Sequence, residues 1–324
     1  MSFTLDEDGY AIVNFVKSFF NLKSESKDSL IGKKNVYHLR IKKLFYRWID
    51  KSISEEDLIE LRETLYRDNN KQWAPLGTNI IQHKTNCPQL CRYCYNIAWK
   101  HRSEKLEIPD IEDTREMFCT DEKRVEKVWT TRKKANLYIF GSTHDIFPEM
   151  IDDYISVARK VIESGSELLI VTKPNLVCMK KLCKELKDLK DKIMIVCTIT
   201  SNDKDLLEYW EPHAPLYKER VECLKYAYDQ GYRTSVSMEP YLSDPRKVIK
   251  DICRYVTHYV WLGKMNHCKE LEFDEEQYEK LDGLYDEEYV MDLIKDLRDN
   301  KKVFFKYSMM RAVGLTGKRL VKSK

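Results

Sequence analysis

Three cysteines stand close together between Asn86 and Tyr95. Cys87, Cys91 and Cys94 follow a Cys-x3-Cys-x2-Cys spacing, which puts three thiolates on one short loop with no fourth cysteine nearby. Such a loop suits a four-iron cluster in which cysteines hold three irons and the fourth iron is left open. The spacing therefore predicts an iron-sulfur site with one iron free to bind something else.

Two other interpretations of these cysteines stay open. The same thiolates could bind zinc with His83 or His101 as the fourth ligand, because mixed Cys3His sites are ordinary structural zinc sites. Zinc knuckles usually arise from two separated ligand pairs, however, whereas these three thiols share one loop. The remaining alternative, three unrelated thiols in a core, is disfavoured by their close spacing.

Composition narrows the class of protein. The chain has 324 residues, of which 43% are hydrophobic, and no apolar run approaches the length of a membrane span. Its start lacks the basic and apolar regions of a secretory signal, so we expect a cytoplasmic protein whose ten cysteines are reduced. A net charge of +3, from 56 basic and 53 acidic residues, neither demands nor excludes a nucleic-acid partner.

The pattern of apolar residues divides the chain into three parts. Residues 1–75 show helical periodicity, and residues 52–57 read as a helix start with a capping serine and carboxylates in the first turn. Residues 76–268 alternate short apolar runs with helical stretches and form the expected core. Residues 269–324 are expected to be a C-terminal extension of helix and strand, ending in a basic tail.

Alternating strands and helices predict an α/β fold with right-handed crossovers and a parallel sheet. The expected strands lie near 78–82, 137–140, 168–172, 193–199, 233–239 and 259–262, with 303–305 as a candidate last strand. Six such units fall short of a closed eight-stranded barrel. They favour an open, partial (βα)6 TIM-like barrel with its chemistry at the carboxyl ends of the strands, where the cysteine loop follows the first strand.

Polar residues follow the second and third expected strands. Gly141 allows close backbone approach, and Ser142, Thr143 and Asp145 place hydroxyls and a carboxylate where a cationic amino group could be held. The same residues could instead cap the helix that begins near residue 148. Lys173, after the third strand, could meet a carboxylate as a point charge, or could be a snorkelling rim residue.

The fifth expected strand carries a row of polar side chains. Alternation sends Ser235, Ser237 and Glu239 to one face and Val236 and Met238 to the other. Central parallel strands are normally apolar on both faces. The polar row is therefore expected to line a cavity.

Together these stretches resemble the radical S-adenosylmethionine superfamily and, within it, the spore photoproduct lyase-like proteins. The resemblance covers roughly residues 76 to 262. It rests on Cys87, Cys91 and Cys94 with Tyr93 and Tyr95 beside the last, on Ser142-Thr143-His144-Asp145, on Val171-Thr172-Lys173, and on Glu211-Pro212-His213-Ala214-Pro215 followed by Glu219-Arg220.

The resemblance implies that the three cysteines hold a [4Fe-4S] cluster whose open iron takes S-adenosylmethionine. One electron from the cluster would then break a carbon-sulfur bond to give a 5'-deoxyadenosyl radical that abstracts hydrogen from a substrate. An external one-electron donor such as flavodoxin or ferredoxin is implied as well. The candidate contacts to S-adenosylmethionine are Ser142, Thr143, Asp145, Lys173, Ser237 and Glu239.

Catalytic roles also follow from the resemblance. In the lyase, the tyrosines matched by Tyr93 and Tyr95 pass a hydrogen atom, and a hydrogen-donating cysteine stands where this chain has Ser142. A serine O–H bond is much stronger than a thiol S–H bond and is a poor donor to a carbon radical, which argues against thymine dimer reversal by the lyase route. Cys119 or Cys197 could substitute, although Cys197 sits in an apolar strand and reads as a buried, inert thiol.

Three functions remain for comparison. The first is a radical enzyme acting on a nucleic acid or nucleotide, as the resemblance implies. The second is the same machinery acting on a peptide or small molecule, although no separate leader-peptide domain is recognised in the sequence. The third is a zinc-binding protein without enzymatic activity. The residues at the strand ends favour the two enzymes over the third.

Overall fold

The computed structural model describes residues 30–67, 77–79, 87, 89–94, 137–141, 145–265 and 275–317. The chain divides into two compact units, Met1–Leu76 with Leu315–Lys324, and Gly77–Gly314. None of the helices within the described ranges combines the length and the apolar character needed to cross a membrane.

The described part of the first unit contains two helices, α2 (Leu30–Ile49) and α3 (Glu55–Arg67). The expected start of the second helix is confirmed, because the Ser54 hydroxyl accepts a hydrogen bond from the amide of Asp57 at 3.2 Å. Ion pairs join the two helices: Arg40 Nε lies 2.7 Å from Glu60 Oε1, and Arg47 binds Asp57. The part of the chain before α2 lies outside the described residues.

The second unit is built on seven parallel strands that lie in the sheet in the order of the sequence. The six expected strands and the candidate seventh are all present, and the predicted α/β partial barrel is confirmed. The strands are β1 (Gly77–Asn79), β2 (Leu137–Phe140), β3 (Glu167–Thr172), β4 (Ile193–Thr198), β5 (Arg233–Met238), β6 (Val260–Leu262) and β7 (Val303–Phe305).

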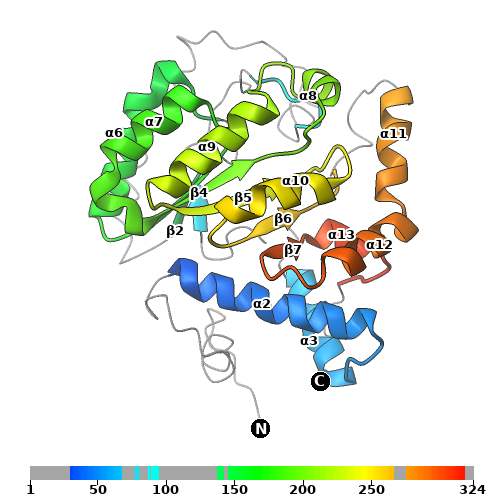
Figure 1. Cartoon of the computed structure of the whole chain (residues 1–324). Coiled ribbons are helices and arrows are strands. Elements are labelled where there is room, and N and C mark those ends of the chain that lie inside the picture. Colours follow the sequence, from blue (N-terminus) through cyan, green and yellow to red (C-terminus); the bar gives the residue numbers. More distant parts are fainter. Residues whose placement is uncertain are drawn as a thin grey trace, which may run out of the picture. The chain divides into compact units, whose positions relative to one another are not determined.

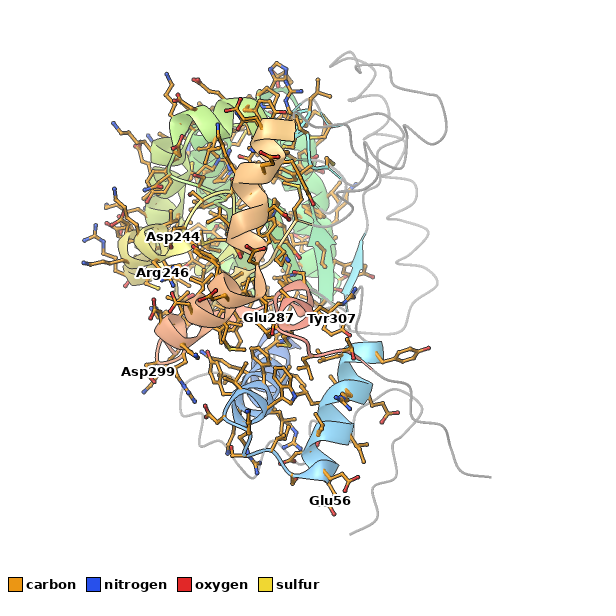
Figure 2. The ribbon with its side chains drawn as sticks, turned by 90° about the vertical axis from the view of Figure 1, so that its right-hand side faces the viewer. Glu56, Asp244, Arg246, Glu287, Asp299 and Tyr307 are labelled. Atoms are coloured by element: carbon orange, nitrogen blue, oxygen red, sulfur yellow. The ribbon has the colours of Figure 1, made fainter. Side chains whose placement is uncertain are left out.

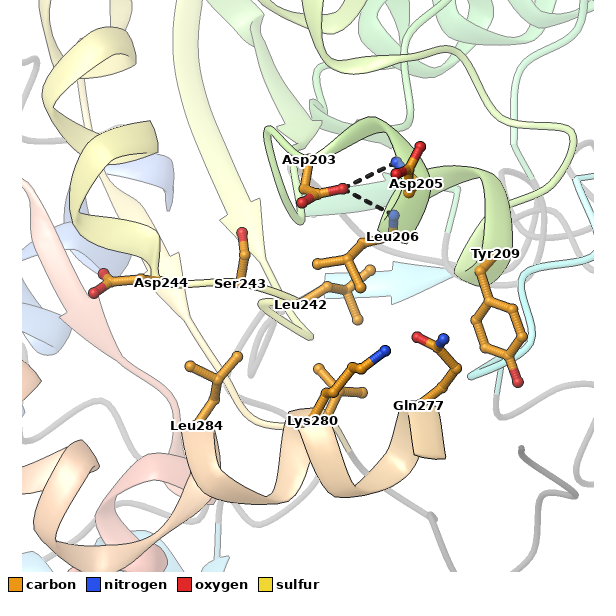
Figure 3. A pocket seen from close by; sticks show the side chains of 11 residues that line it. Asp203, Asp205, Leu206, Tyr209, Leu242, Ser243, Asp244, Gln277, Lys280 and Leu284 are labelled. Carbon is orange, nitrogen blue, oxygen red and sulfur yellow. Dashed lines mark hydrogen bonds between the residues drawn. The ribbon is translucent and has the colours of Figure 1, made fainter. Parts of the chain in front are cut away.

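Helices α6, α7, α9 and α10 lie over one face of this sheet (Figure 1). Two of them, α7 and α10, are capped by the side chains of Asn175 and Asp244, and Asp203 caps α8 in the same way (Figure 3). Among the described residues of this unit, the helical segments are η1 (Pro148–Met150), α6 (Ile151–Glu163), α7 (Leu176–Glu185), η2 (Lys187–Lys192), α8 (Lys204–Trp210), α9 (Tyr217–Asp229), α10 (Pro245–Ile252), η3 (Cys253–Tyr255), α11 (Glu275–Tyr285), α12 (Glu287–Leu297) and α13 (Tyr307–Ala312).

The core lies between the sheet and its helices. Every residue of β4 is buried, as expected for a central parallel strand. On the other face of the sheet, the Ser235 hydroxyl lies 3.1 Å from the sulfur of Met194, so this part of the polar row is packed inside the sheet rather than open to a cavity. Register pairs Ser237 with Thr198 and Trp261 at the carboxyl end of β5.

The C-terminal helices belong to the same unit as the sheet. Within residues 269–324, the predicted extension of helix and strand, β7 pairs with β6 and continues the sheet. Arg246 lies at the start of α10, beside Asp244 (Figure 2). It forms ion pairs with Asp244 and with Asp292 and Asp296 of α12. These contacts fasten α12 to the helical layer.

Candidate functional site

The cysteine loop is shaped by two consecutive turns. The Leu90 amide donates to the Cys87 carbonyl oxygen at 3.1 Å, and the Cys94 amide donates to the Cys91 carbonyl oxygen at 2.9 Å. Leu90 adopts a positive φ of 45°, an uncommon conformation for a residue with a side chain. Cys91 is buried, whereas Cys87 and Cys94 are partly exposed, and all three are free thiols.

Electrostatics place this loop beside residues that follow β2 and β3. Burial raises the pKa of the Cys87 thiol, and the nearby Asp145 carboxylate raises it further. Burial also raises the pKa of Cys91 to about 12, while the Lys173 ammonium works in the opposite direction. Asp145 and Lys173 therefore lie close enough to the loop to influence its thiols.

Arg92 fastens the loop to the end of α8. Its backbone amide donates to the carbonyl oxygen of Trp210 at 2.9 Å, and its Nε donates to the carbonyl oxygen of Tyr209 at 2.7 Å. The guanidinium also lies over the Tyr209 ring, with its central carbon 4.6 Å from the ring centroid. Three contacts from one side chain and its backbone hold the middle of the loop in place.

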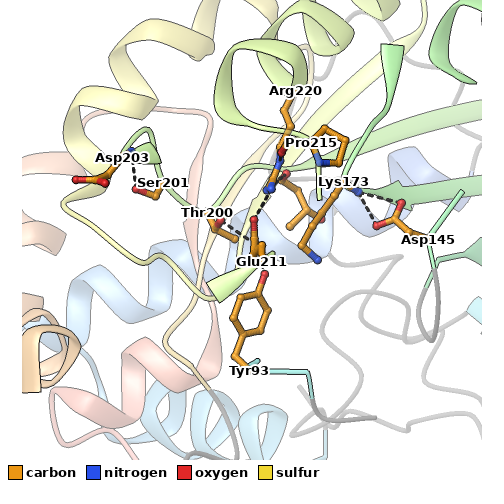
Figure 4. Close-up of polar contacts among 10 residues, drawn as sticks. Tyr93, Asp145, Lys173, Thr200, Ser201, Asp203, Glu211, Pro215 and Arg220 are labelled. Atoms are coloured by element: carbon orange, nitrogen blue, oxygen red, sulfur yellow. Dashed lines mark hydrogen bonds and ion pairs between the residues drawn. The ribbon is translucent and has the colours of Figure 1, made fainter. Parts of the chain in front are cut away.

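Tyr93 makes a second connection, to a buried carboxylate after α8 (Figure 4). Its hydroxyl donates to Glu211, which also accepts a hydrogen bond from the Thr200 hydroxyl at 3.0 Å and forms an ion pair with Arg220. The Glu211 and Arg220 side chains are 0% and 1% exposed. Burial alone would raise the pKa of Glu211, but Arg220, Lys173 and the hydrogen bonds outweigh it and lower the pKa.

Arg220 also connects Glu211 to the carboxyl end of β4. Its Nε lies 2.5 Å from the carbonyl oxygen of Pro215, and its Nη1 lies 3.3 Å from the carbonyl oxygen of Thr198. The motif Glu211 to Arg220, which the sequence offered only as part of a resemblance, is thus a buried support for the cysteine loop. The sequence predicts no role for these two residues, because the contact of Glu211 with Tyr93 spans 118 residues of sequence and Arg220 acts through Glu211.

The Asp145 carboxylate is occupied by hydrogen bonds from other groups of the chain. It accepts hydrogen bonds from the Thr172 hydroxyl, from the Ile146 amide at 3.0 Å and from the Lys173 amide at 2.9 Å (Figure 4). Burial raises the pKa of Asp145, and the Lys173 charge opposes that rise. Asp145 therefore ties the carboxyl end of β3 to the segment after β2 and fixes the backbone of Lys173.

Lys173 lies near both the cysteine loop and the Glu211 carboxylate. Its Nζ is 5.6 Å from the centroid of the Tyr93 ring. Burial alone would lower the pKa of Lys173, but the neighbouring Cys91, Glu211 and Asp145 outweigh it, so the pKa is raised and the side chain carries a positive charge. The structure thus brings Cys91, Tyr93, Asp145 and Lys173 together at one edge of the sheet.

The two candidates from β5 stand at the same carboxyl edge. Ser237 is buried near the end of the strand, and Glu239 follows it with 22% of its side chain exposed. The remaining candidates, Tyr95, Ser142 and Thr143, lie outside the described residues.

The zinc alternatives and one of the possible thiol donors, His83, His101 and Cys119, likewise lie outside the described residues. The other possible donor, Cys197, is fully buried in β4, and burial raises its pKa well above the ordinary value, with Cys223 of α9 contributing. It lies on the side of the sheet that the helices cover, as the interpretation of a buried thiol expects.

A pocket of about 470 Å³ opens beside Tyr209, the residue whose carbonyl oxygen accepts the hydrogen bond from Arg92. The start of α8 forms one side of the pocket, and α11 forms the other (Figure 3). Its lining residues are Asp203, Asp205, Leu206, Tyr209, Leu242, Ser243, Asp244, Gln277, Lys280, Leu281 and Leu284. Tyr209 therefore connects the wall of the pocket to the cysteine loop.

A comparison with protein-family models supplies the deciding observation. Residues 81–254, which include the cysteine loop and the ends of β2 to β5, match the model of the Radical SAM superfamily. The chain belongs to the radical SAM superfamily. It is therefore a radical SAM enzyme, and the cofactors of the family are a [4Fe-4S] cluster and S-adenosylmethionine (SAM).

Individual relatives are more distant. An uncharacterized protein of Acidianus two-tailed virus is 29% identical over 129 residues, which are 40% of this chain and 42% of that protein. A solved spore photoproduct lyase variant with bound AdoMet and dinucleoside spore photoproduct is 12% identical, with a TM-score of 0.42 over 84% of this chain and 95% of that one. Streptococcus suis SuiB bound to the precursor peptide SuiA is 14% identical, with a TM-score of 0.49 over 87% and 67%.

The donor set of the loop fits the cluster of the family. Within the described part of the chain, no three His, Cys, Asp or Glu side chains converge on a single metal ion. A four-iron cluster does not require such convergence, because each cysteine binds a different iron. The loop carries three separate thiols on two successive turns, and the contacts of Arg92 and Tyr93 hold these turns in place. Each thiol can therefore bind a different iron of the cluster.

Proposed function

We propose that Cys87, Cys91 and Cys94 hold the [4Fe-4S] cluster of this radical SAM enzyme. When bound, the cluster supplies the electron that cleaves SAM, and the resulting 5'-deoxyadenosyl radical abstracts hydrogen from the substrate. The observation that carries the proposal is the attachment of the loop through Tyr93 to Glu211 and Arg220. It holds the thiols at the carboxyl edge of β3 and β4, where a partial barrel places its chemistry.

Cysteine variants test this assignment. Serine substitution at Cys87, Cys91 or Cys94 should each remove most of the iron and sulfide from anaerobically reconstituted protein. Cys253→Ser is the matched control, because Cys253 is a partly exposed thiol in η3, ahead of β6 and away from the carboxyl edge. Full iron in all three loop variants, or stoichiometric zinc in the wild-type protein, would contradict the assignment.

We further propose that SAM lies across the carboxyl edge, beside the cluster. Lys173 is suited to the SAM carboxylate as a charge fixed in place by its backbone contact to Asp145. Ser237 and Glu239 offer a hydroxyl and a carboxylate at the end of β5, and Ser142 and Thr143 stay candidates for the amino group. Asp145 acts indirectly, because its carboxylate already accepts hydrogen bonds from the chain.

Tyr93, Tyr95 and Ser142 stay our candidates for moving a hydrogen atom. Tyr93 has a structural task in addition, because its hydroxyl donates to Glu211 and so holds the loop. Ser142 is a poor hydrogen donor to a carbon radical. We therefore propose a reaction other than the reversal of a thymine dimer by a thiol at this position.

Two classes of substrate are compared. A nucleic acid or nucleotide is the class implied by the likeness of the motifs to spore photoproduct lyase-like proteins. The pocket beside Tyr209 favours a peptide or small molecule instead, because Asp203 and Asp205 would repel phosphates placed there, while Lys280 is the one cation among its lining residues. Its leucines would pack against an apolar group.

Binding measurements separate these classes. Affinity for an oligonucleotide that falls steeply as salt rises would support the nucleic-acid substrate. Weak oligonucleotide binding, with a Lys280→Glu variant that does not weaken it further, would support the second class. For either substrate we expect an external one-electron donor such as flavodoxin or ferredoxin, and a cytoplasmic setting that keeps the thiols reduced.

A further inference from the structure

A buried lysine stands at the carboxyl end of β7, beyond the residues that match the family model. Lys306 is only 2% exposed, and its backbone amide donates to the carbonyl oxygen of Leu262 at 2.7 Å. Its Nζ lies 3.1 Å from Glu239 Oε2 and 5.4 Å from the centroid of the Trp261 ring. The ammonium group is thus held between a carboxylate and an aromatic face.

Because Gly263 has no side chain, it leaves room for the Glu239 side chain to reach Lys306. A Cβ atom at position 263 would lie 2.8 Å from Glu239 Oε1 and 2.9 Å from its Cγ and Cδ, closer than real Cβ contacts allow. Glu239 therefore crosses directly over the backbone at the end of β6. Any larger residue at position 263 would push the carboxylate away from its place.

Exposure within the pair is unequal. The Lys306 side chain is 3% exposed, whereas that of Glu239 is 22% exposed. The lysine therefore lies beneath, and the carboxylate faces the edge where S-adenosylmethionine is proposed to bind. Burial lowers the pKa of Lys306 to about 8, although Glu239 opposes this, so at neutral pH the lysine is mainly charged and paired.

We propose that Lys306 is a positioning residue for S-adenosylmethionine: it holds the Glu239 carboxylate, from below and across Gly263, in the orientation that accepts a hydrogen bond from a hydroxyl or amino group of the cofactor. This inference rests on the proposed function, which assigns Glu239 to S-adenosylmethionine. It adds β7 and α13 to the elements that build the site.

The test measures S-adenosylmethionine binding to anaerobically reconstituted holoprotein by calorimetry. Lys306→Met should raise Kd about tenfold, as should Glu239→Gln. The double variant should bind no more weakly than Glu239→Gln alone, because a residue that acts through Glu239 has nothing further to lose. If Lys306 were needed only for general stability, the losses of binding free energy in the two single variants would add in the double variant.

Lys302→Met is the matched control. Lys302 precedes β7 at its opposite end, where its Nζ donates to the carbonyl oxygens of Cys253 and Val256. Its loss should leave Kd within about twofold of wild type. Gly263→Ala provides a second route, because it displaces Glu239 while keeping Lys306, and it should also weaken binding about tenfold.

The outcomes separate two failures. Wild-type holoprotein that does not bind S-adenosylmethionine would overturn the proposed function and this inference with it. Wild-type binding together with unchanged affinity in Lys306→Met, or in Gly263→Ala if the lysine variant does not fold, would overturn this inference alone. Additive losses in the double variant would also overturn it.

Discussion

Replacing Glu211 by Gln tests how the cysteine loop is held. The substitution keeps the size of the side chain but leaves the Arg220 guanidinium buried without its counter-charge. Breaking a buried pair in this way costs about 3–5 kcal/mol. Arg220 keeps the carbonyl oxygens of Pro215 and Thr198 as acceptors, so we expect a loss in unfolding free energy at the lower end, about 3 kcal/mol.

The companion variants are Arg220→Met and the double variant. Arg220→Met should cost a similar amount, because the buried Glu211 carboxylate then loses its ion pair and keeps the hydrogen bonds from the Tyr93 and Thr200 hydroxyl groups. The double variant removes both charges, so its loss should fall short of the sum by about 2 kcal/mol or more. Urea unfolding of anaerobic holoprotein at pH 7, followed by circular dichroism, measures all three losses.

A surface pair provides the control. Asp292 is 67% exposed and pairs with Arg246, so replacing it by Asn should lower the free energy of unfolding by less than about 1 kcal/mol. Losses at Glu211 and Arg220 that add to within about 0.5 kcal/mol would refute the reasoning, as would a loss below about 1 kcal/mol in Glu211→Gln.

Three further predictions follow from the same contacts. Tyr93→Phe removes one hydrogen bond to the Glu211 carboxylate, worth about 1.5–3 kcal/mol, and a chelator should extract iron faster from this variant than from wild type; equal rates would contradict this. Because the pKa of Glu211 is lowered in the folded protein, its ionised carboxylate stabilises the fold above pH 4.5, the ordinary pKa, and this stabilisation is lost as pH falls through the folded pKa. Below pH 4.5, the free energy of unfolding should therefore fall less steeply in Glu211→Gln than in wild type. Lys306, with its pKa lowered from 10.5 to about 8, binds fewer protons folded than unfolded between these values. The free energy of unfolding of wild type should therefore rise relative to that of Lys306→Met as pH rises from 8 to 10. A difference between the two proteins that stays constant over this range would contradict the prediction.

The sequence predicts strands such as β2, β4 and β7 well because they are short, strongly apolar runs. The expected strands at 137–140 and 303–305 match β2 and β7 residue for residue. Burial on both faces of a parallel sheet leaves little room for other residue types, so local composition carries most of the signal. The carboxyl-edge placement of Asp145 and Lys173 follows from the same pattern.

The connections between the strand ends were not predictable in this way. The contact of Tyr93 with Glu211 joins residues 118 positions apart, and that of Lys306 with Glu239 joins the carboxyl ends of β5 and β7. Glu211 and Arg220 read locally as ordinary charged residues, and only their complete burial shows that they must pair. Likewise, the three donors to Asp145 turn a candidate cofactor contact into a support for Lys173.

The most direct test of the central claim is the release of 5'-deoxyadenosine from SAM by chemically reduced, anaerobically reconstituted protein. We predict release by the wild-type protein and none by Cys91→Ser, which lacks the buried thiol of the loop. Wild-type protein with its full iron and sulfide that leaves SAM intact would contradict the account, and so would release by Cys91→Ser at the wild-type rate.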